Sequence, residues 1–190
     1  DLRIMKECVQ TRLNLEMAAT DEMATIALET MPDQITLVPE KREEQTTEGG
    51  LDVAGLQSEL QSYLVQFREV GMRVIMFVDP DIDQIRASQD IGAQGVEIHT
   101  GDYCDATSNA ERAGELNRIY DASEFAAEAG LFVAAGHGLD YVNVEAVCSI
   151  PSILELNIGH SIVARALFVG MDQAVREMQE ILDAFPRGEE

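Results

Sequence analysis

Short apolar runs alternate with longer amphipathic segments along the chain, and this alternation limits the folds open to it. The clearest run, residues 131–135, leads directly into Gly136-His137-Gly138. Apolar runs of this length with β-branched members are typical of buried strands. Similar runs begin near residues 13, 35, 73, 95 and 153. Six strand-helix units in succession predict an α/β protein with a parallel sheet and right-handed crossovers.

Polar residues at alternate strand positions distinguish between two parallel architectures. Three strands show the pattern, in the pairs Asn14/Glu16, Glu97/His99 and Glu155/Asn157. A doubly wound sheet has helices on both faces and no place for such carboxylates, whereas the inner face of a barrel leads up to an active site. We therefore expect a single (β/α)8 TIM-barrel domain over residues 1–190. Because such a barrel closes with about eight strands, we expect the first two βα units to be missing from this chain.

Local signals predict several helix ends and one functional loop. Thr20 and Ser161 are expected to be N-cap residues. A long helix is expected over about residues 53–70, with Gly71 as the residue that follows it. The polar segment 40–50 is long enough to be a lid or binding loop, although it could equally be a solvated connection.

Charge and composition exclude some classes of partner. The 190 residues have a formal net charge of −22, which argues against nucleic acid or an anionic membrane as a partner. No apolar run approaches the roughly 18 residues of a membrane span, and no signal peptide is visible. The three cysteines are scattered without metal-ligand spacing, which favours a reduced, cytoplasmic compartment.

All three histidines follow directly on predicted strands. His99, His137 and His160 lie at or just past a carboxyl end, where parallel α/β folds bind their ligands. One such histidine is more often structural, but three favour a shared site. No His-x-His or His-x-x-x-His spacing is present, so we expect no metal.

Carboxylates and glycines complete the candidate site. Partial burial in a barrel mouth would raise the pKa of Glu16 and Glu97 toward the working range of a general base; ion pairs with arginines are the alternative. Glu155 lies deeper in its strand and is interpreted as structural. Gly138 and Gly159 end the last two strands, where barrels often bind phosphate through backbone N–H groups. These glycines could also serve only as turns.

Six stretches together resemble the pyridoxine 5′-phosphate synthase family, barrel enzymes that close the ring of vitamin B6. The stretches are NLEMA (14–18), LVPEKR (37–42), TTEGGLD (46–52), EIHTG (97–101), AGHGL (135–139) and ELNIGH (155–160). They occur in order over nearly the whole chain, and the set is far more specific than any one member.

The resemblance implies a reaction and a role for each site residue. The family condenses 3-amino-2-oxopropyl phosphate with 1-deoxy-D-xylulose 5-phosphate to give pyridoxine 5′-phosphate, phosphate and water, without a metal or organic cofactor. By resemblance, Glu16 is a general base, His137 is a general acid and Glu97 stabilises charge in the transition state. The residues expected to bind the aminooxopropyl phosphate are Thr46, Gly138, Gly159 and His160.

The resemblance also implies an oligomeric assembly, and it shows one respect in which this chain differs from the family. Family members form homo-oligomers of eight barrels and begin with two further βα units, which contain another catalytic histidine and contacts to the deoxyxylulose phosphate. By this resemblance, we expect these units to be missing from the 190 residues. One alternative is a truncated, inactive relative that binds a phosphate ligand or serves assembly. Another is a different phosphate-binding barrel, such as an aldolase, for which Lys41 is the only lysine near a strand end.

Overall fold

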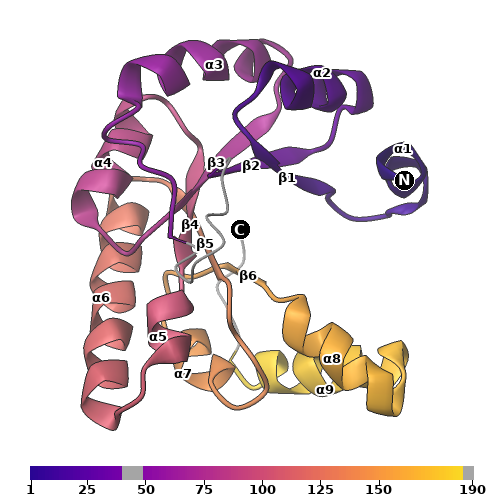
Figure 1. The fold of residues 1–190 in the computed structure, drawn as a ribbon, viewed down its shortest axis with the longest axis vertical. Helices are drawn as coiled ribbons and strands as arrows, with labels where there is room; N and C mark the ends of the chain where they lie inside the picture. Colours follow the sequence, from indigo (N-terminus) through magenta and orange to yellow (C-terminus); the bar gives the residue numbers. More distant parts are fainter. Residues whose placement is uncertain (40–48, 186–190) are drawn as a thin grey trace.

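Six parallel strands form one sheet in a computed structural model that describes residues 1–39 and 49–185. The strands follow one another in chain order across the sheet, as β1 (Asn14–Ala18), β2 (Gln34–Val38), β3 (Arg73–Val78), β4 (Gly95–His99), β5 (Phe132–Gly136) and β6 (Glu155–Asn157). A doubly wound sheet would reverse its order at a switch point. Figure 1 shows that this sheet instead curls like part of a barrel. The α/β class and the parallel sheet are therefore confirmed, and the curl of the six strands is consistent with part of a TIM barrel.

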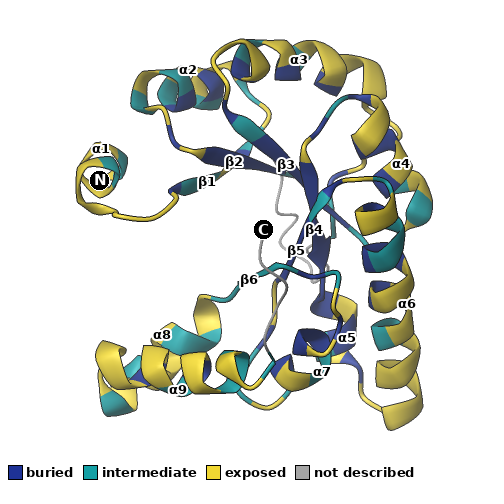
Figure 2. Ribbon diagram, turned by 180° about the vertical axis from the view of Figure 1, so that it is seen from behind, coloured by how far each residue is buried: buried dark blue, intermediate teal, exposed yellow. Residues whose placement is uncertain are grey.

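Helices cover the outer side of the curled sheet (Figure 1), most of them as connections between successive strands. They are α1 (Leu2–Cys8), α2 (Asp21–Thr30), α3 (Gln57–Glu69), α4 (Ile82–Asp90), α5 (Gly101–Asp105), α6 (Asn109–Glu128), α7 (Val144–Cys148), α8 (His160–Val169) and α9 (Met171–Asp183). Figure 2 shows buried strands and helices whose outward faces are exposed, with α8 exposed along most of its length. Within the described residues, no helix has the length and apolar character that crossing a membrane requires.

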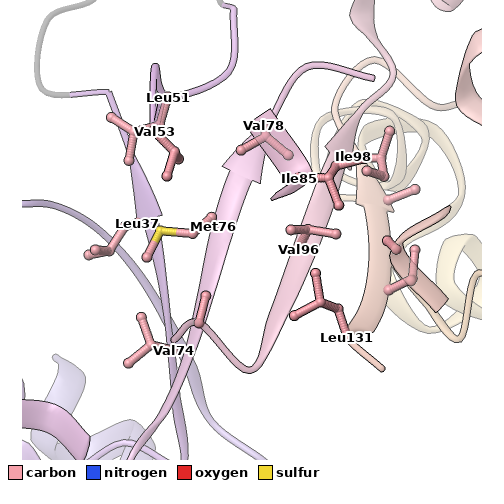
Figure 3. Packing of buried hydrophobic residues seen from close by; sticks show 14 of the residues in the cluster. Leu37, Leu51, Val53, Val74, Met76, Val78, Ile85, Val96, Ile98 and Leu131 are labelled. Atoms are coloured by element: carbon pink, nitrogen blue, oxygen red, sulfur yellow. The ribbon is translucent and has the colours of Figure 1, made fainter. Parts of the chain in front are cut away.

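The hydrophobic core lies between the outer face of the sheet and the helices. Leu37, Met76 and Val96 stand in register on three neighbouring strands and belong to this core. Figure 3 shows them with their neighbours on the same side of the sheet. Phe67 of α3 is fully buried against it. Because side chains alternate along a strand, the residues between these core positions point to the inner face, where the polar groups lie.

The predicted helix ends are partly confirmed. Thr20 caps α2, because its hydroxyl accepts a hydrogen bond from the Met23 N–H at 3.3 Å. The prediction for Ser161 is wrong. Gly159 occupies the N-cap position of α8, one residue before the helix starts, and the Ser161 hydroxyl donates instead to the Leu139 carbonyl at 2.8 Å.

Two helical details differ from expectation. The helix expected from residue 53 begins at Gln57, because the Asp52 carboxylate accepts the Gly55 N–H at 3.0 Å and holds a local turn there. Gly71 follows that helix with a φ of 75°, as predicted for its C-terminal end. The short helix α5 was not anticipated; the buried Tyr103 fixes it through a hydroxyl bond to the Asn143 carbonyl at 2.7 Å.

Candidate active site

A buried carboxyl group stands at the centre of the inner face. Glu97 of β4 is only 3% exposed, and its Oε2 accepts a hydrogen bond from Asn157 Nδ2 of β6 at 2.7 Å. This bond crosses β5, where Gly136 lies between the two residues. A methyl group on Gly136 would lie 2.6 Å from Glu97 Oε1 and 2.9 Å from the Asn157 carbonyl oxygen. Glycine at this position therefore allows the carboxyl group and the amide to meet.

Burial raises the pKa of Glu97 to about 8. Burial is the largest cause, the negative charge of Glu16 acts in the same direction, and the hydrogen bond from Asn157 opposes both. Glu97 is therefore protonated at neutral pH and has an O–H group to donate. The expected burial holds for Glu97 and not for Glu16, whose side chain on β1 is exposed.

The turn after β5 presents an exposed histidine with an unusual backbone. His137 has a φ of 80° and Gly138 a φ of 79°, a region that residues other than glycine seldom adopt. The hydroxyl of the buried Thr100 donates to the carbonyls of Gly136 and His137, at 2.8 and 2.5 Å. Asn143 Nδ2 donates to the Gly138 carbonyl at 3.3 Å. These bonds satisfy the carbonyl groups of the turn and fix the position of His137.

The ring of His99 lies beside that of His137. The two ring centroids are 5.0 Å apart, and His99 Nδ1 is 3.1 Å from Asp79 Oδ1 at the end of β3. The structure thus brings together two of the three histidines that were expected to share a site. Sequence reasoning missed Asp79, although it follows directly on a predicted strand, the same signal that identified the histidines.

The start of α8 lies next to the turn after β5. Gly159 is the N-cap of this helix and His160 is its first residue; both are exposed, and the bond from Ser161 to Leu139 joins the helix to the turn. Among the described residues, no side chain caps the amino end of α8. Because of the Ser161 bond, the N–H groups at the amino end of α8 lie close to those of the turn around Gly138. Thr46, with the rest of 40–48, lies outside the described residues.

Glu155 of β6 lies in register with Glu97 through Ala134 of β5. Its carboxylate lies 3.6 Å from the guanidinium of Arg12, which precedes β1. This ion pair agrees with the structural interpretation of Glu155. In the part of the chain that the structure describes, no group of three or more His, Cys, Asp or Glu side chains is arranged to hold a metal ion.

These features define an α/β barrel-type protein whose polar and titratable groups meet at the carboxyl ends of its strands. Residues 1–184 match the family model described as pyridoxal phosphate biosynthesis protein PdxJ. The chain belongs to this family.

Curated relatives and a solved structure agree with the family and the fold. Over 182 residues, the chain is 52% identical to the pyridoxine 5′-phosphate synthase of Syntrophotalea carbinolica and 54% identical to that of a Synechococcus strain. Each alignment covers 96% of this chain and 76% of the relative. A chain in the crystal structure of the Amycolatopsis orientalis BexX/CysO complex has a TM-score of 0.53 at 19% identity, over 88% of this chain and 64% of that one. At that identity the likeness concerns the fold alone.

Proposed function

We propose that the chain acts as a pyridoxine 5′-phosphate synthase, like its curated relatives. The reaction condenses 3-amino-2-oxopropyl phosphate with 1-deoxy-D-xylulose 5-phosphate and releases phosphate and water. Its imine formation, dehydration and enolisation need repeated proton transfers at neutral pH. The observation that carries the proposal is the buried Glu97 carboxyl group, which Asn157 holds at the inner face, in a chain about half identical to synthases.

Three residues would move or stabilise charge. Glu16 would act as general base from its exposed position on β1. His137 would act as general acid from a turn that Thr100 holds through two hydrogen bonds. Glu97 would stabilise charge in the transition state, by hydrogen bonding from its protonated carboxyl group. We include no metal or organic cofactor in this scheme.

The phosphate of the aminooxopropyl substrate would bind where the turn after β5 meets α8. The groups proposed to hold it are Gly138, Gly159 and His160, together with Thr46. The uncapped amino end of α8 supports this assignment, since N–H groups and the helix dipole there favour an anion. With a net charge of −22, the protein repels anions at long range. The phosphate must therefore be held by such local donors.

The complete fold and assembly are also part of the proposal. We propose a (β/α)8 barrel in which two further βα units accompany the six seen here, as the curled sheet and the 76% coverage of the relatives support. We also propose a homo-oligomer. Leu167 and Phe168 of α8 are 83% and 85% exposed, and large apolar groups at such exposure are typical of surfaces that other protein covers. Light scattering of the purified protein tests this assembly.

The deciding experiment measures pyridoxine 5′-phosphate formed from the two phosphorylated substrates. It uses this chain alone and the product of the complete natural gene, with each substrate omitted in turn as control. Product that requires both substrates supports the synthase. A folded protein that forms none in either version contradicts it, and binding of a phosphate ligand without chemistry then becomes the better account.

A further inference from the structure

A buried histidine and a neighbouring aspartate lie beside His137, and the reaction scheme gives neither a role. His99 is 7% exposed. Its ring packs edge-on against Phe77, with centroids 5.2 Å apart, and lies 5.0 Å from the ring of His137. Its Nδ1 lies 3.1 Å from Asp79 Oδ1. A ring enclosed in this way has little freedom to turn.

The hydrogen bond to Asp79 determines which nitrogen of His99 carries a proton. A carboxylate only accepts hydrogen bonds, so Nδ1 must donate. Asp79 remains ionised at neutral pH, because the hydrogen bond with His99 lowers the pKa of its carboxyl group and that of the Gly50 N–H, at 2.8 Å, adds to this effect. His99 Nε2 is buried and, among the described residues, has no hydrogen-bond partner. The Asp79 bond is therefore the polar contact that orients this ring.

The space around the two imidazoles is closely fitted. A methyl group on Gly101 would lie 2.6 Å from His99 Nε2 and 3.4 Å from His137 Cδ2. The turn that bears His137 has a left-handed backbone, a region that residues other than glycine seldom adopt. The ring of His99, with its centroid 5.0 Å from that of His137, supports the exposed ring from within the protein.

We propose that Asp79 and His99 are positioning residues for His137. Asp79 fixes the ring of His99, and that ring holds the imidazole of His137 where proton transfer takes place. The catalytic part of this inference rests on the proposed function, in which His137 is the general acid. Misplacing a reacting group by about 1 Å can cost roughly 100-fold in rate, so a positioning pair should act on kcat far more than on KM.

Imidazole ¹⁵N NMR tests the pair without any assay of activity. The wild-type chain is expected to show His99 protonated at Nδ1, and Asp79→Ala should lose this form. Asp79→Asn should keep it, because its amide oxygen can still accept from Nδ1 and from Gly50. Asp81→Asn is the matched control, since Asp81 caps α4 through the Asp83 N–H and asparagine also caps helices well. Wild-type His99 protonated only at Nε2 would overturn the pair.

Steady-state kinetics of the complete enzyme tests the catalytic part. Asp79→Ala should lower kcat by about 10- to 100-fold and change each KM less than about threefold, while Asp79→Asn should recover most of the loss. His99→Asn keeps an N–H donor toward Asp79 but removes the ring, so it should lose kcat as Asp79→Ala does. If Asp79→Ala folds poorly, the kcat of His99→Asn tests the positioning role instead.

The two proposals can fail separately. Wild-type kcat in folded His99→Asn, or no recovery by Asp79→Asn, would overturn the positioning role while leaving the synthase intact. A folded wild-type enzyme without turnover would refute the synthase and, with it, the catalytic part of the pair. The NMR result would still show whether Asp79 orients His99.

Discussion

Strand β4, near the middle of the sheet, encloses its site residues, whereas the edges of the sheet leave theirs exposed. On β4, Glu97 and His99 are 3% and 7% exposed and bond to the side chains of Asn157 on β6 and of Asp79, which follows β3. Glu16 on β1 and His160 at the start of α8 are both exposed. Substitutions at the centre should therefore disturb packing and protonation as well as chemistry. Those at the edges should change chemistry or binding with little effect on stability.

Glu16→Gln should have the largest effect of all on turnover. The amide keeps the size of the side chain but cannot accept a proton, and a general base contributes about 10²- to 10⁴-fold to rate. We expect kcat to fall by at least 100-fold, while the unfolding midpoint stays close to that of the wild type, because surface substitutions usually change stability by less than about 0.5 kcal/mol. A folded variant with wild-type turnover would remove Glu16 as the base.

Glu97 should make stability depend on pH. Its carboxyl group has an ordinary pKa of 4.5 and a folded pKa of about 8, so between these values the folded state binds more protons than the unfolded state. The free energy of unfolding should then fall as pH rises from about 5 to 8, by on the order of 3 kcal/mol at about 1.36 kcal/mol per unit. Urea titrations at several pH values measure this slope.

Two substitutions sharpen that measurement. Glu97→Gln keeps an acceptor for Asn157 but cannot ionise, so it should flatten the pH dependence. Glu180→Gln, at an exposed position of α9, should leave the wild-type slope unchanged. An equal slope in the wild type and Glu97→Gln would mean that Glu97 does not titrate in this range.

A pair of glycine substitutions compares the two regions directly. Alanine at Gly136 would meet Glu97 Oε1 and the Asn157 carbonyl oxygen, so overpacking should cost about 1–3 kcal/mol. Alanine at Gly159 would meet no described atom within 4 Å, at a φ of −124°, and should cost less than about 1 kcal/mol. Urea midpoints of the two variants measure the difference. Equal losses would contradict the contrast between centre and edge.

Much of the fold could be predicted because each strand shows its own signal. The apolar runs placed all six strands, and the alternate polar residues predicted an inner face that Glu97 and Asn157 now define. Ser161 failed as a cap because an N-cap depends on where the helix begins, and Gly159 occupies that position. A shift of two residues lies within the usual uncertainty of element boundaries.

The pairings within the site could not be predicted from local pattern. Asn157 and Glu97 are 60 residues apart in sequence, and only the register through β5 brings them into contact. The resemblance supplied roles for Glu97 and His137, but it said nothing of Asp79 or of the ring contact between the histidines. Such contacts depend on sheet curvature and side-chain direction, which are properties of the assembled fold.

The smallest expected effect, at the edge, concerns binding rather than turnover. His160→Ala should raise the KM for the aminooxopropyl phosphate by about 10-fold, the equivalent of one charge-assisted hydrogen bond of roughly 1.5 kcal/mol, with kcat nearly unchanged. His160→Gln keeps an N–H donor, so its KM for the aminooxopropyl phosphate should lie between those of the wild type and of His160→Ala. The KM for the deoxyxylulose phosphate is the internal control. If His160→Ala left both constants at wild-type values, the phosphate would have to be held by the backbone N–H groups of α8 and the turn after β5 without this side chain.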